Sequence, residues 1–258
     1  MDAVILAAGM GTRLRPYTDN LPKCLIEIEG KTLLEYSLDA LLVNGVKRVL
    51  IVTGFLAEMI KTRFGNNYQG IDINYINNDE YETTGHAYSL SLSNDFINDD
   101  TLIIEGDLFY EPLAVEFLIK NSDENVILTA SLSGSGDEVF LYTDKYGNLT
   151  NIKRDKKNTF TINKDLTQDD ILLGELTGLS KFSKKFFDKI YSSIQNAYKK
   201  GNKEQYYEEA LFLASREMPV KCRLMKDLVW TEIDDEKDLL KARKIFKDMS
   251  HKFTDKVK

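Results

Sequence analysis

A short loop near the start of the chain carries two glycines and two cations at spacings that suit a polyphosphate. It follows the apolar run 4–8 and contains, in order, Gly9, Gly11 and Arg13, with Lys23 after a proline further on. The glycines allow a sharp turn and bring bare N–H groups close to anionic oxygens. Arg13 offers a planar fork of donors and Lys23 a mobile point charge. These residues therefore predict a site that wraps a chain of phosphate groups.

Carboxylates stand at the ends of two further apolar segments. Asp107 follows the run 101–105, and the adjacent pair Asp234 and Asp235 follows the run 229–233. In open parallel sheets, ligands bind along the edge where the strands end. One carboxylate from each segment can hold Mg²⁺, which takes one or two carboxylates beside phosphate oxygens. Asp235 is also a good N-cap for the next helix, which favours Asp234 as the ligand.

The elements that position these residues alternate between strand and helix through the first half of the chain. Apolar runs predict strands at 4–8, 48–53, 71–75 and 101–105. Helices are predicted between the capping residue Thr32 and Gly45 and at 57–63 and 88–96, with an extended segment at 24–29. This alternation implies right-handed crossovers and a mainly parallel sheet flanked by helices, which is an α/β fold.

The pattern changes in the second half of the chain. There the sequence predicts a hairpin of 138–143 and 149–153, an extended segment 171–181, helices 183–200, 204–216 and 236–249, and strands 221–225 and 229–233. We therefore expect one domain over residues 1–250, in which residues 133–182 form a small β-rich lobe over the active site. Residues 251–258 are predicted to be a charged tail.

Composition narrows the classes of protein that fit. The 258 residues are 43% hydrophobic and 29% charged, which is ordinary for a globule with a substantial core, and the net charge of −7 argues against general binding to nucleic acid. No stretch is long enough for a membrane span, and the run 4–8 is too short for a signal peptide. Cys24 and Cys222 lack a C-x-x-C spacing. We therefore expect a cytoplasmic protein with no nucleic-acid or membrane partner. The sequence leaves open whether the chain forms a homodimer.

At the residues described above, the chain resembles a known family. The stretch 6–14 and the following Pro22-Lys23 are similar to the G-x-G-x-R…P-K loop of the nucleotidyltransferases, which make nucleotide-sugars and CDP-alcohols. Further along, Tyr81 and the run 88–90 resemble the CTP-dependent cytidylyltransferases for phosphocholine and 2-aminoethylphosphonate. The resemblance implies a Rossmann-like, mainly parallel (mixed) sheet, and it implies CTP and a small phosphorylated or phosphonate acceptor as binding partners.

The resemblance also implies roles for individual residues. It implies that Arg13 and Lys23 are catalytic. It also implies that Asp107 and Asp234 bind a Mg²⁺ cofactor, with Asp235 as the alternative to Asp234. The nucleotide-binding residues are Leu6, Ala7, Ala8, Gly9, Gly11, Thr12, Arg13, Lys23, Gly85, Ser89 and Asp107. The acceptor-binding residues are Lys153, Glu175, Tyr206 and Glu209. At helical spacing Tyr206 and Glu209 are neighbours, and an aromatic face beside a carboxylate attracts ammonium groups.

The function that these residues favour is a Mg²⁺-dependent cytidylyltransferase. It transfers CMP from CTP to a small amine-bearing phosphate or phosphonate and releases pyrophosphate. The alternative is a sugar-1-phosphate nucleotidyltransferase using UTP, dTTP or GTP, but the Pro-x-Gly-Thr-Ala turn and the Glu-Lys-Pro typical of that branch are missing from this sequence. A third class is a regulatory subunit that binds nucleotide without turnover. Walker and dinucleotide-binding patterns are absent from the sequence.

Overall fold

The structure is a computed structural model that describes residues 1–136, 138–154 and 166–254. Two predicted features fall partly outside these ranges: the β-rich lobe, at residues 137 and 155–165, and the charged tail, at residues 255–258. Among the described residues, no helix combines the length and the apolar character that crossing a bilayer requires.

Ten strands of the described residues form one mixed sheet in the order β11-β10-β12-β7-β1-β4-β6-β5, with β9 and β13 continuing from β12. Their bounds are β1 (Asp2–Ala7), β4 (Arg48–Thr53), β5 (Asn67–Tyr68), β6 (Ile71–Asn77), β7 (Thr101–Glu105), β9 (Val126–Ala130), β10 (Val139–Thr143), β11 (Leu149–Arg154), β12 (Ile171–Phe182) and β13 (Lys221–Met225). Strands β7, β1, β4 and β6 run parallel, whereas β12 pairs antiparallel with β7, β9 and β10. The predicted α/β fold with a mixed sheet is confirmed.

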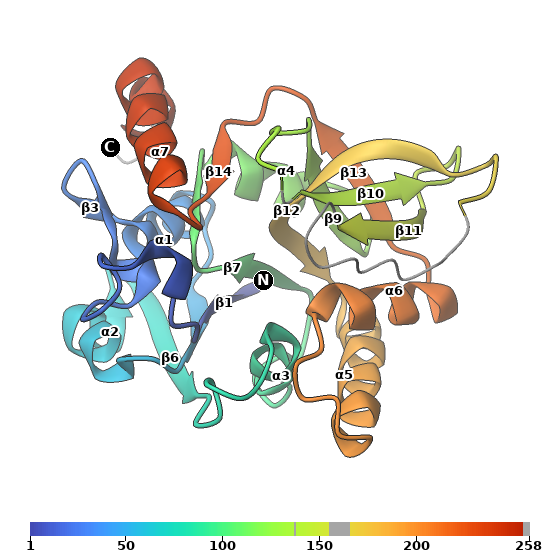
Figure 1. Ribbon diagram of the computed structural model, residues 1–258, viewed down its shortest axis with the longest axis horizontal. Coiled ribbons are helices and arrows are strands. Elements are labelled where there is room, and N and C mark those ends of the chain that lie inside the picture. The colour runs from blue at the N-terminus through green and yellow to red at the C-terminus, as the bar shows by residue number, and fades with distance from the viewer. Residues whose placement is uncertain (137, 155–165, 255–258) are drawn as a thin grey trace.

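Two small ribbons and the helices complete the molecule. The ribbons pair β2 (Glu27–Ile28) with β3 (Lys31–Thr32), and β8 (Leu108–Tyr110) with β14 (Trp230–Glu232). The helices are α1 (Leu33–Val43), α2 (Ala57–Phe64), α3 (His86–Ser91), α4 (Leu113–Lys120), α5 (Lys184–Lys199), α6 (Tyr207–Glu217), α7 (Glu236–Met249) and α8 (His251–Thr254), with 3₁₀ turns η1 (Thr12–Leu14) and η2 (Lys23–Leu25). Figure 1 shows β1, β6, α1 and α2 on one side of the molecule and β9 to β13 on the other.

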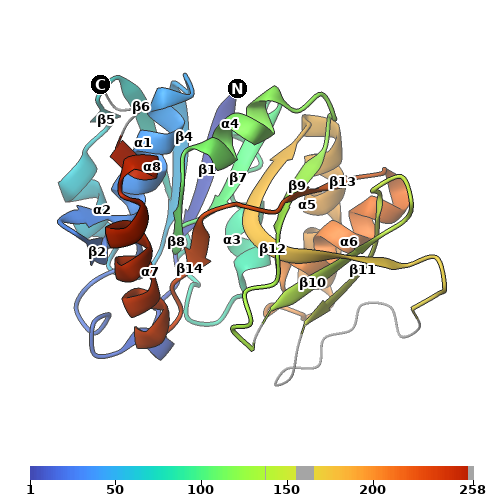
Figure 2. The same ribbon diagram turned by 90° about the horizontal axis from the view of Figure 1, so that it is seen from above.

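Alternation along the strands produces two cores, one on each face of the sheet. On β1, Ala3 and Ile5 belong to a core shared with α1, α2 and α4, while Val4 belongs to a core shared with α3, α5 and α6. A third cluster packs α7 and α8 against α1 and β8, and Figure 2 shows β14 beside β8, next to α7. The paired ribbon β8–β14 thus brings residue 234, far along the chain, next to residue 107.

Helix caps fix the starts of α1 and α7. The Thr32 hydroxyl accepts the backbone N–H of Glu35 at 3.1 Å, and the Glu35 carboxylate accepts the N–H of Thr32 at 2.7 Å, which is the predicted capping box. Gly45 follows α1 at φ 79°, the left-handed conformation expected just past a helix end. At α7, Asp235 accepts from the N–H groups of Lys237 and Asp238.

The structure differs from the predicted elements in several segments. Helix α4 and strand β9 were not predicted, and the segment 24–29 divides into η2 and β2. Helix α3 ends at Ser91 rather than 96, because the hydroxyls of Ser91 and Ser93 bond to nearby backbone carbonyls and compete with helical bonding. The predicted charged tail begins as α8, whose Phe253 is buried against Tyr36 and Phe109.

Candidate active site

A cleft of about 530 Å³ opens at the carboxyl ends of β1 and β7. The predicted site residues that line it are Leu6, Ala8, Gly9, Gly11, Thr12, Arg13, Lys23, Gly85, Ser89, Asp107, Glu175, Tyr206 and Asp234. Ala7, Lys153 and Glu209, all within the described ranges, are not among the lining residues. Leu6 and Ala8 share one face of the extended chain, so Ala7 points to the opposite face and packs on the core.

The glycine loop holds Lys23 against the cleft. Gly11 has φ 61°, and the Thr18 hydroxyl donates to its carbonyl at 2.7 Å. A Cβ at position 11 would lie 3.1 Å from Thr18 Cγ2 and 3.2 Å from Lys23 Cβ. Only glycine meets both demands, because a side chain is strained at this φ and crowded by these neighbours. The loop can therefore close tightly over the segment that carries Lys23.

Lys23 joins the two predicted metal-binding aspartates. Its Nζ lies 2.8 Å from Asp107 Oδ2 and 2.6 Å from Asp234 Oδ1. Arg13 Nη2 lies 2.7 Å from Asp234 Oδ2. Burial alone would lower the pKa of Lys23, but the charges of Asp107 and Asp234 outweigh it and raise the pKa. Burial likewise works to raise the pKa of Asp234, and Lys23 and Arg13 hold it below its usual range.

The adjacent aspartates at the start of α7 have separate environments. Asp234 faces the cleft and pairs with Lys23 and Arg13. Asp235 is the N-cap of α7 and accepts the N–H of Lys237 at 2.7 Å. The predicted preference for Asp234 over Asp235 on the cleft side therefore agrees with the geometry, because the cap occupies the Asp235 carboxylate.

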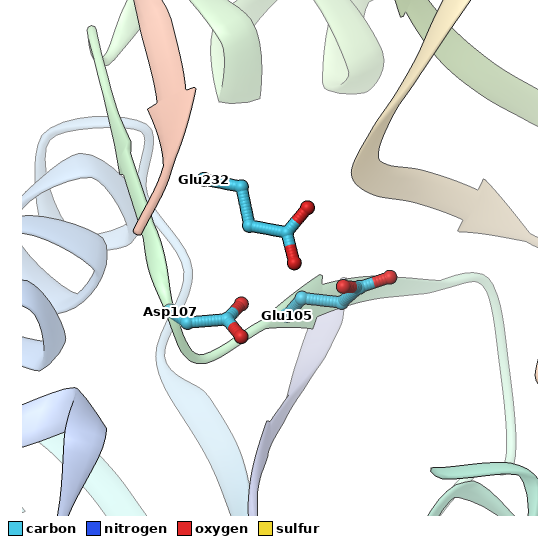
Figure 3. Close-up of side chains that lie close together, drawn as sticks. All are labelled: Glu105, Asp107 and Glu232. Atoms are coloured by element: carbon cyan, nitrogen blue, oxygen red, sulfur yellow. The ribbon is translucent and has the colours of Figure 1, made fainter. Parts of the chain in front are cut away.

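Figure 3 shows three carboxylates that gather in the cleft, those of Glu105, Asp107 and Glu232. Ligand oxygens of Glu105, Asp107 and Glu232 lie within 4.8 Å of one another. Burial raises the pKa of both Glu105 and Glu232 well above normal, and the charge of Asp107 raises it further. Within the described part of the chain, Asp107 Oδ1 is buried without a hydrogen-bond partner. Clustered carboxylate oxygens with one left unbonded fit a hard divalent cation such as Mg²⁺.

Glu105 and Glu232 were not among the predicted site residues. Each stands two residues before a predicted metal-binding aspartate, Asp107 or Asp234. An acidic residue at the last position of a strand, two residues before a predicted ligand, was the signal that could have found them. The approach of the two Glu-x-Asp segments depends on the pairing of Glu232 with Leu108 across β14 and β8, which no local pattern reveals.

Gly85 and Ser89 lie where the start of α3 meets the segment before α6. The N–H of Gly85 donates to the Lys203 carbonyl at 2.8 Å, and a Cβ on Gly85 would lie 2.6 Å from the Gln205 carbonyl oxygen. The Ser89 hydroxyl accepts from Asn78 Nδ2 at 3.0 Å. Close packing at Gly85 thus fixes the segment that leads to Tyr206 against the start of α3.

The opposite wall of the cleft contains Glu175 and Tyr206. The Glu175 carboxylate accepts the Ser133 N–H at 2.7 Å and the Ser133 hydroxyl at 3.1 Å. Burial raises the pKa of Glu175, and the bonds from Ser133 work in the opposite direction. Tyr206 is the N-cap residue of α6, and its ring lies 5.2 Å from that of His86, edge to face.

Two predicted acceptor-binding residues differ from the observed lining by one position. Arg154 lines the cleft, whereas Lys153 lies with its Nζ 5.7 Å from the centre of the Tyr142 ring, because neighbours on a strand face opposite sides. Glu208 lines the cleft and Glu209 does not. Helical spacing from Tyr206 was the wrong guide, since Tyr206 has extended backbone angles and α6 begins only at Tyr207.

Comparisons with known proteins agree with this geometry. The chain matches the family described as Nucleotidyl transferase over residues 2–138, more than half its length. It is 26% identical over 245 residues to CMP-5'-(3-aminopropyl)phosphonate synthase of Streptomyces rubellomurinus, covering 93% of this chain but only 38% of that protein. It is 27% identical over 255 residues to CTP:phosphoglutamine cytidylyltransferase of Campylobacter jejuni, covering 93% of this chain and 98% of that one.

A solved structure supports the same relationship. CTP:phosphocholine cytidylyltransferase from Streptococcus pneumoniae superposes with a TM-score of 0.73 and 26% identity, covering 95% of this chain and 98% of that chain. The family match spans the glycine loop, β7 and Asp107, which are the parts that build one wall of the cleft. The chain belongs to the nucleotidyl transferase family.

Proposed function

We propose that this chain is a Mg²⁺-dependent cytidylyltransferase that transfers CMP from CTP to a small amine-bearing phosphate or phosphonate and releases pyrophosphate. The observation that carries the proposal is the convergence of Asp107 and Asp234 on Lys23, beside the glycine loop and Arg13. The names of similar proteins favour CTP, since phosphoglutamine and phosphocholine cytidylyltransferases match along nearly their whole length.

The reaction requires positioning more than acid–base chemistry. An oxygen of the acceptor phosphate attacks the α-phosphorus, a new P–O bond forms, and the bond between the α-phosphorus and the bridging oxygen breaks as pyrophosphate leaves in line. The attacking oxygen is already ionised near neutral pH, so no general base is needed. Catalysis then depends on holding the two phosphates together and neutralising their charge.

The cations and carboxylates of the cleft divide this work. Asp107 and Asp234 would hold Mg²⁺, which supplies positive charge to phosphate oxygens of both substrates when bound. The backbone N–H groups of the glycine loop and the guanidinium of Arg13 bind the β- and γ-phosphates. Lys23 stays protonated because of its carboxylate neighbours, and it neutralises charge that develops at the α-phosphate.

The remaining lining residues select the substrates. Gly85 and Ser89 line the cleft, and the proposal puts the base beside them, where a backbone group and a hydroxyl can meet the hydrogen-bonding edge of cytosine. Glu175, Tyr206 and Glu208 lie on the opposite wall and receive the acceptor. A carboxylate-rich wall suits an acceptor that carries an ammonium group.

A pyrophosphate-release assay tests the proposal. The full chain is incubated with Mg²⁺, one of CTP, UTP, dTTP or GTP, and a panel of amine-bearing phosphates and sugar-1-phosphates. Release with CTP and an amine-bearing acceptor supports the proposal. Release with another nucleotide and a sugar phosphate would assign the chain to the sugar-nucleotide branch. No release with any pair would indicate a nucleotide-binding protein without turnover.

A further inference from the structure

Arg154 and Glu208 form a pair of opposite charges on the acceptor wall of the cleft. Arg154 ends β11 and Glu208 lies in the first turn of α6, and both line the cleft. Arg154 Nη2 lies 3.7 Å from Glu208 Oε1, which is an ion pair but too long for a hydrogen bond. The side chain of Glu208 is 5% exposed and that of Arg154 is 25% exposed. The two charges are thus largely removed from water without a direct hydrogen bond between them.

Each member of the pair also has unused hydrogen-bonding capacity. Within the residues that the structure describes, Arg154 Nε and Glu208 Oε2 are both buried and have no hydrogen-bond partner. Leaving a buried charged group without hydrogen bonds is costly, and such groups concentrate where a ligand completes the bonding. Because both residues line the cleft, the pair places one unbonded donor and one unbonded acceptor, among the described residues, at the wall that the acceptor would meet.

The aromatic ring beside this pair is already in contact with a cation of the chain itself. Arg154 Cζ lies over the Tyr206 ring, 4.9 Å from its centre, and His86 approaches the same ring edge to face. A ring face that binds a guanidinium is not available to a substrate ammonium. An acceptor whose head group is held only by cation–π contact therefore does not suit Tyr206 in this arrangement.

Glu105 connects the pair with the carboxylates proposed to hold the metal. Burial raises the pKa of its carboxyl, the charges of Asp107 and Glu208 raise it further, and the charge of Arg154 lowers it. The pair thus lies within electrostatic reach of the position where the acceptor phosphate would react. A small acceptor can have its phosphate beside Asp107 while its other end reaches Arg154 and Glu208.

We propose that the acceptor carries a zwitterionic, amino-acid-like head group, whose carboxylate accepts from Arg154 and whose ammonium donates to Glu208. The inference rests on the proposed function and deepens it by naming the class of acceptor. A carboxylate matches the donor fork of arginine, and an ammonium with N–H groups satisfies the free oxygen of Glu208. Choline offers neither group, because its nitrogen has no N–H and it has no carboxylate.

Acceptor preference tests this inference directly. Initial rates of the full chain with CTP and Mg²⁺ are measured on O-phosphoserine, phosphoethanolamine and phosphocholine. We expect kcat/KM for phosphoserine to exceed that for phosphocholine by about tenfold or more, since each hydrogen bond to a charged group contributes about that factor. A kcat/KM for phosphocholine equal to or above that for phosphoserine would overturn the inference.

Variants with matched neighbours assign the contacts. Arg154→Gln should lower kcat/KM for phosphoserine about tenfold or more and leave phosphoethanolamine nearly unchanged. If Arg154→Gln does not fold, Arg154→Lys replaces it, because lysine keeps the positive charge beside Glu208. This variant should also lower kcat/KM for phosphoserine more than kcat/KM for phosphoethanolamine. Glu208→Gln should lower kcat/KM for both phosphoserine and phosphoethanolamine. Lys153→Gln and Glu209→Gln, which alter the adjacent residues outside the cleft, are the controls. Equal losses on all three acceptors in the Arg154 variants would contradict the assignment.

A binding measurement separates this inference from the proposed function. If no nucleotide gives pyrophosphate release, the proposed function fails, and calorimetric titration of phosphoserine and phosphocholine into the full chain still tests the head-group site. Tighter binding of phosphoserine that Arg154→Lys weakens supports the site. Binding of phosphocholine with equal or higher affinity, or failure of phosphoserine to bind, contradicts it.

Discussion

The two walls of the cleft are built in different ways. The nucleotide wall is formed by the loop 9–23 and Asp107, which follow the parallel strands β1 and β7, and by Asp234, which follows the antiparallel strand β14. The acceptor wall, formed by Arg154, Glu175 and the segment 206–208, comes from antiparallel strands and the start of a helix. On the nucleotide wall the predicted residues line the cleft apart from Ala7, whereas on the acceptor wall two of the four predicted residues are displaced by one position.

Local sequence determines the positions of side chains more fully on the nucleotide wall than on the acceptor wall. In the loop 9–23, one short stretch contains both the glycines that set the backbone conformation and the cations that bind phosphate. The sequence of this stretch therefore predicts the positions of its side chains. On a strand, a shift of one residue turns the side chain to the other face. At a helix start, spacing rules apply only from the first helical residue onward.

The largest predicted effect comes from the nucleotide wall. Lys23→Ala and Asp107→Ala should each lower kcat by about 10²–10³-fold, because each removes a preorganised charge at the reacting phosphates. The loss should be similar for every acceptor, since these residues serve the nucleotide and the metal. Steady-state kinetics and a thermal unfolding curve measure activity and folding together. Near-normal turnover by either folded variant would contradict the assignment of that residue to the reacting phosphates.

The adjacent aspartates at the start of α7 provide a matched pair for the next prediction. Asp234→Asn should raise the Mg²⁺ concentration needed for half-maximal activity by about tenfold or more, because a ligand charge is lost. Asp235→Asn should leave this concentration unchanged, since asparagine is as good an N-cap as aspartate. A Mg²⁺ titration of initial rates distinguishes the variants. The reverse result would make Asp235 the ligand and contradict the geometry of the cleft.

A smaller and more selective effect is expected from the acceptor wall. Glu175→Gln should raise KM for the acceptor several-fold, up to about tenfold, because it removes a negative charge that faces the acceptor. KM for CTP should not change. Varying each substrate at saturation of the other measures both constants. A larger effect on CTP than on the acceptor would show that Glu175 belongs to the nucleotide wall.

The smallest effect should come from an element that was well predicted but does not touch the cleft. Thr32→Ala removes one half of the capping box of α1 and should lower the free energy of unfolding by about 1 kcal/mol. Both KM values and kcat should stay as they are. Urea denaturation followed by fluorescence, with kinetics on the same preparation, provides the measurement. A selective loss of activity at unchanged stability would show that α1 influences the cleft directly.

Much of the fold was predictable because buried strands are continuous apolar runs with clear ends. Strands β4 and β7 have the predicted bounds, and the capping box at Thr32 was visible in the sequence. Strand β9 was missed, because periodicity cannot tell a short apolar run in a strand from one in a buried helix. Glu105 and Glu232 were missed for another reason: their meeting depends on pairing between strands far apart in the chain.

In the proposed complex, one magnesium-bound triphosphate lies between Asp107 and Asp234, with Arg13 and Lys23 on its phosphates. A crystal structure of the full chain with CTP and Mg²⁺ tests it most directly. We expect an ion with oxygen ligands from both aspartates and from the triphosphate, at a distance of about 2.1 Å. An ion bound without either aspartate, or a triphosphate that lies away from the loop 9–13, would contradict it.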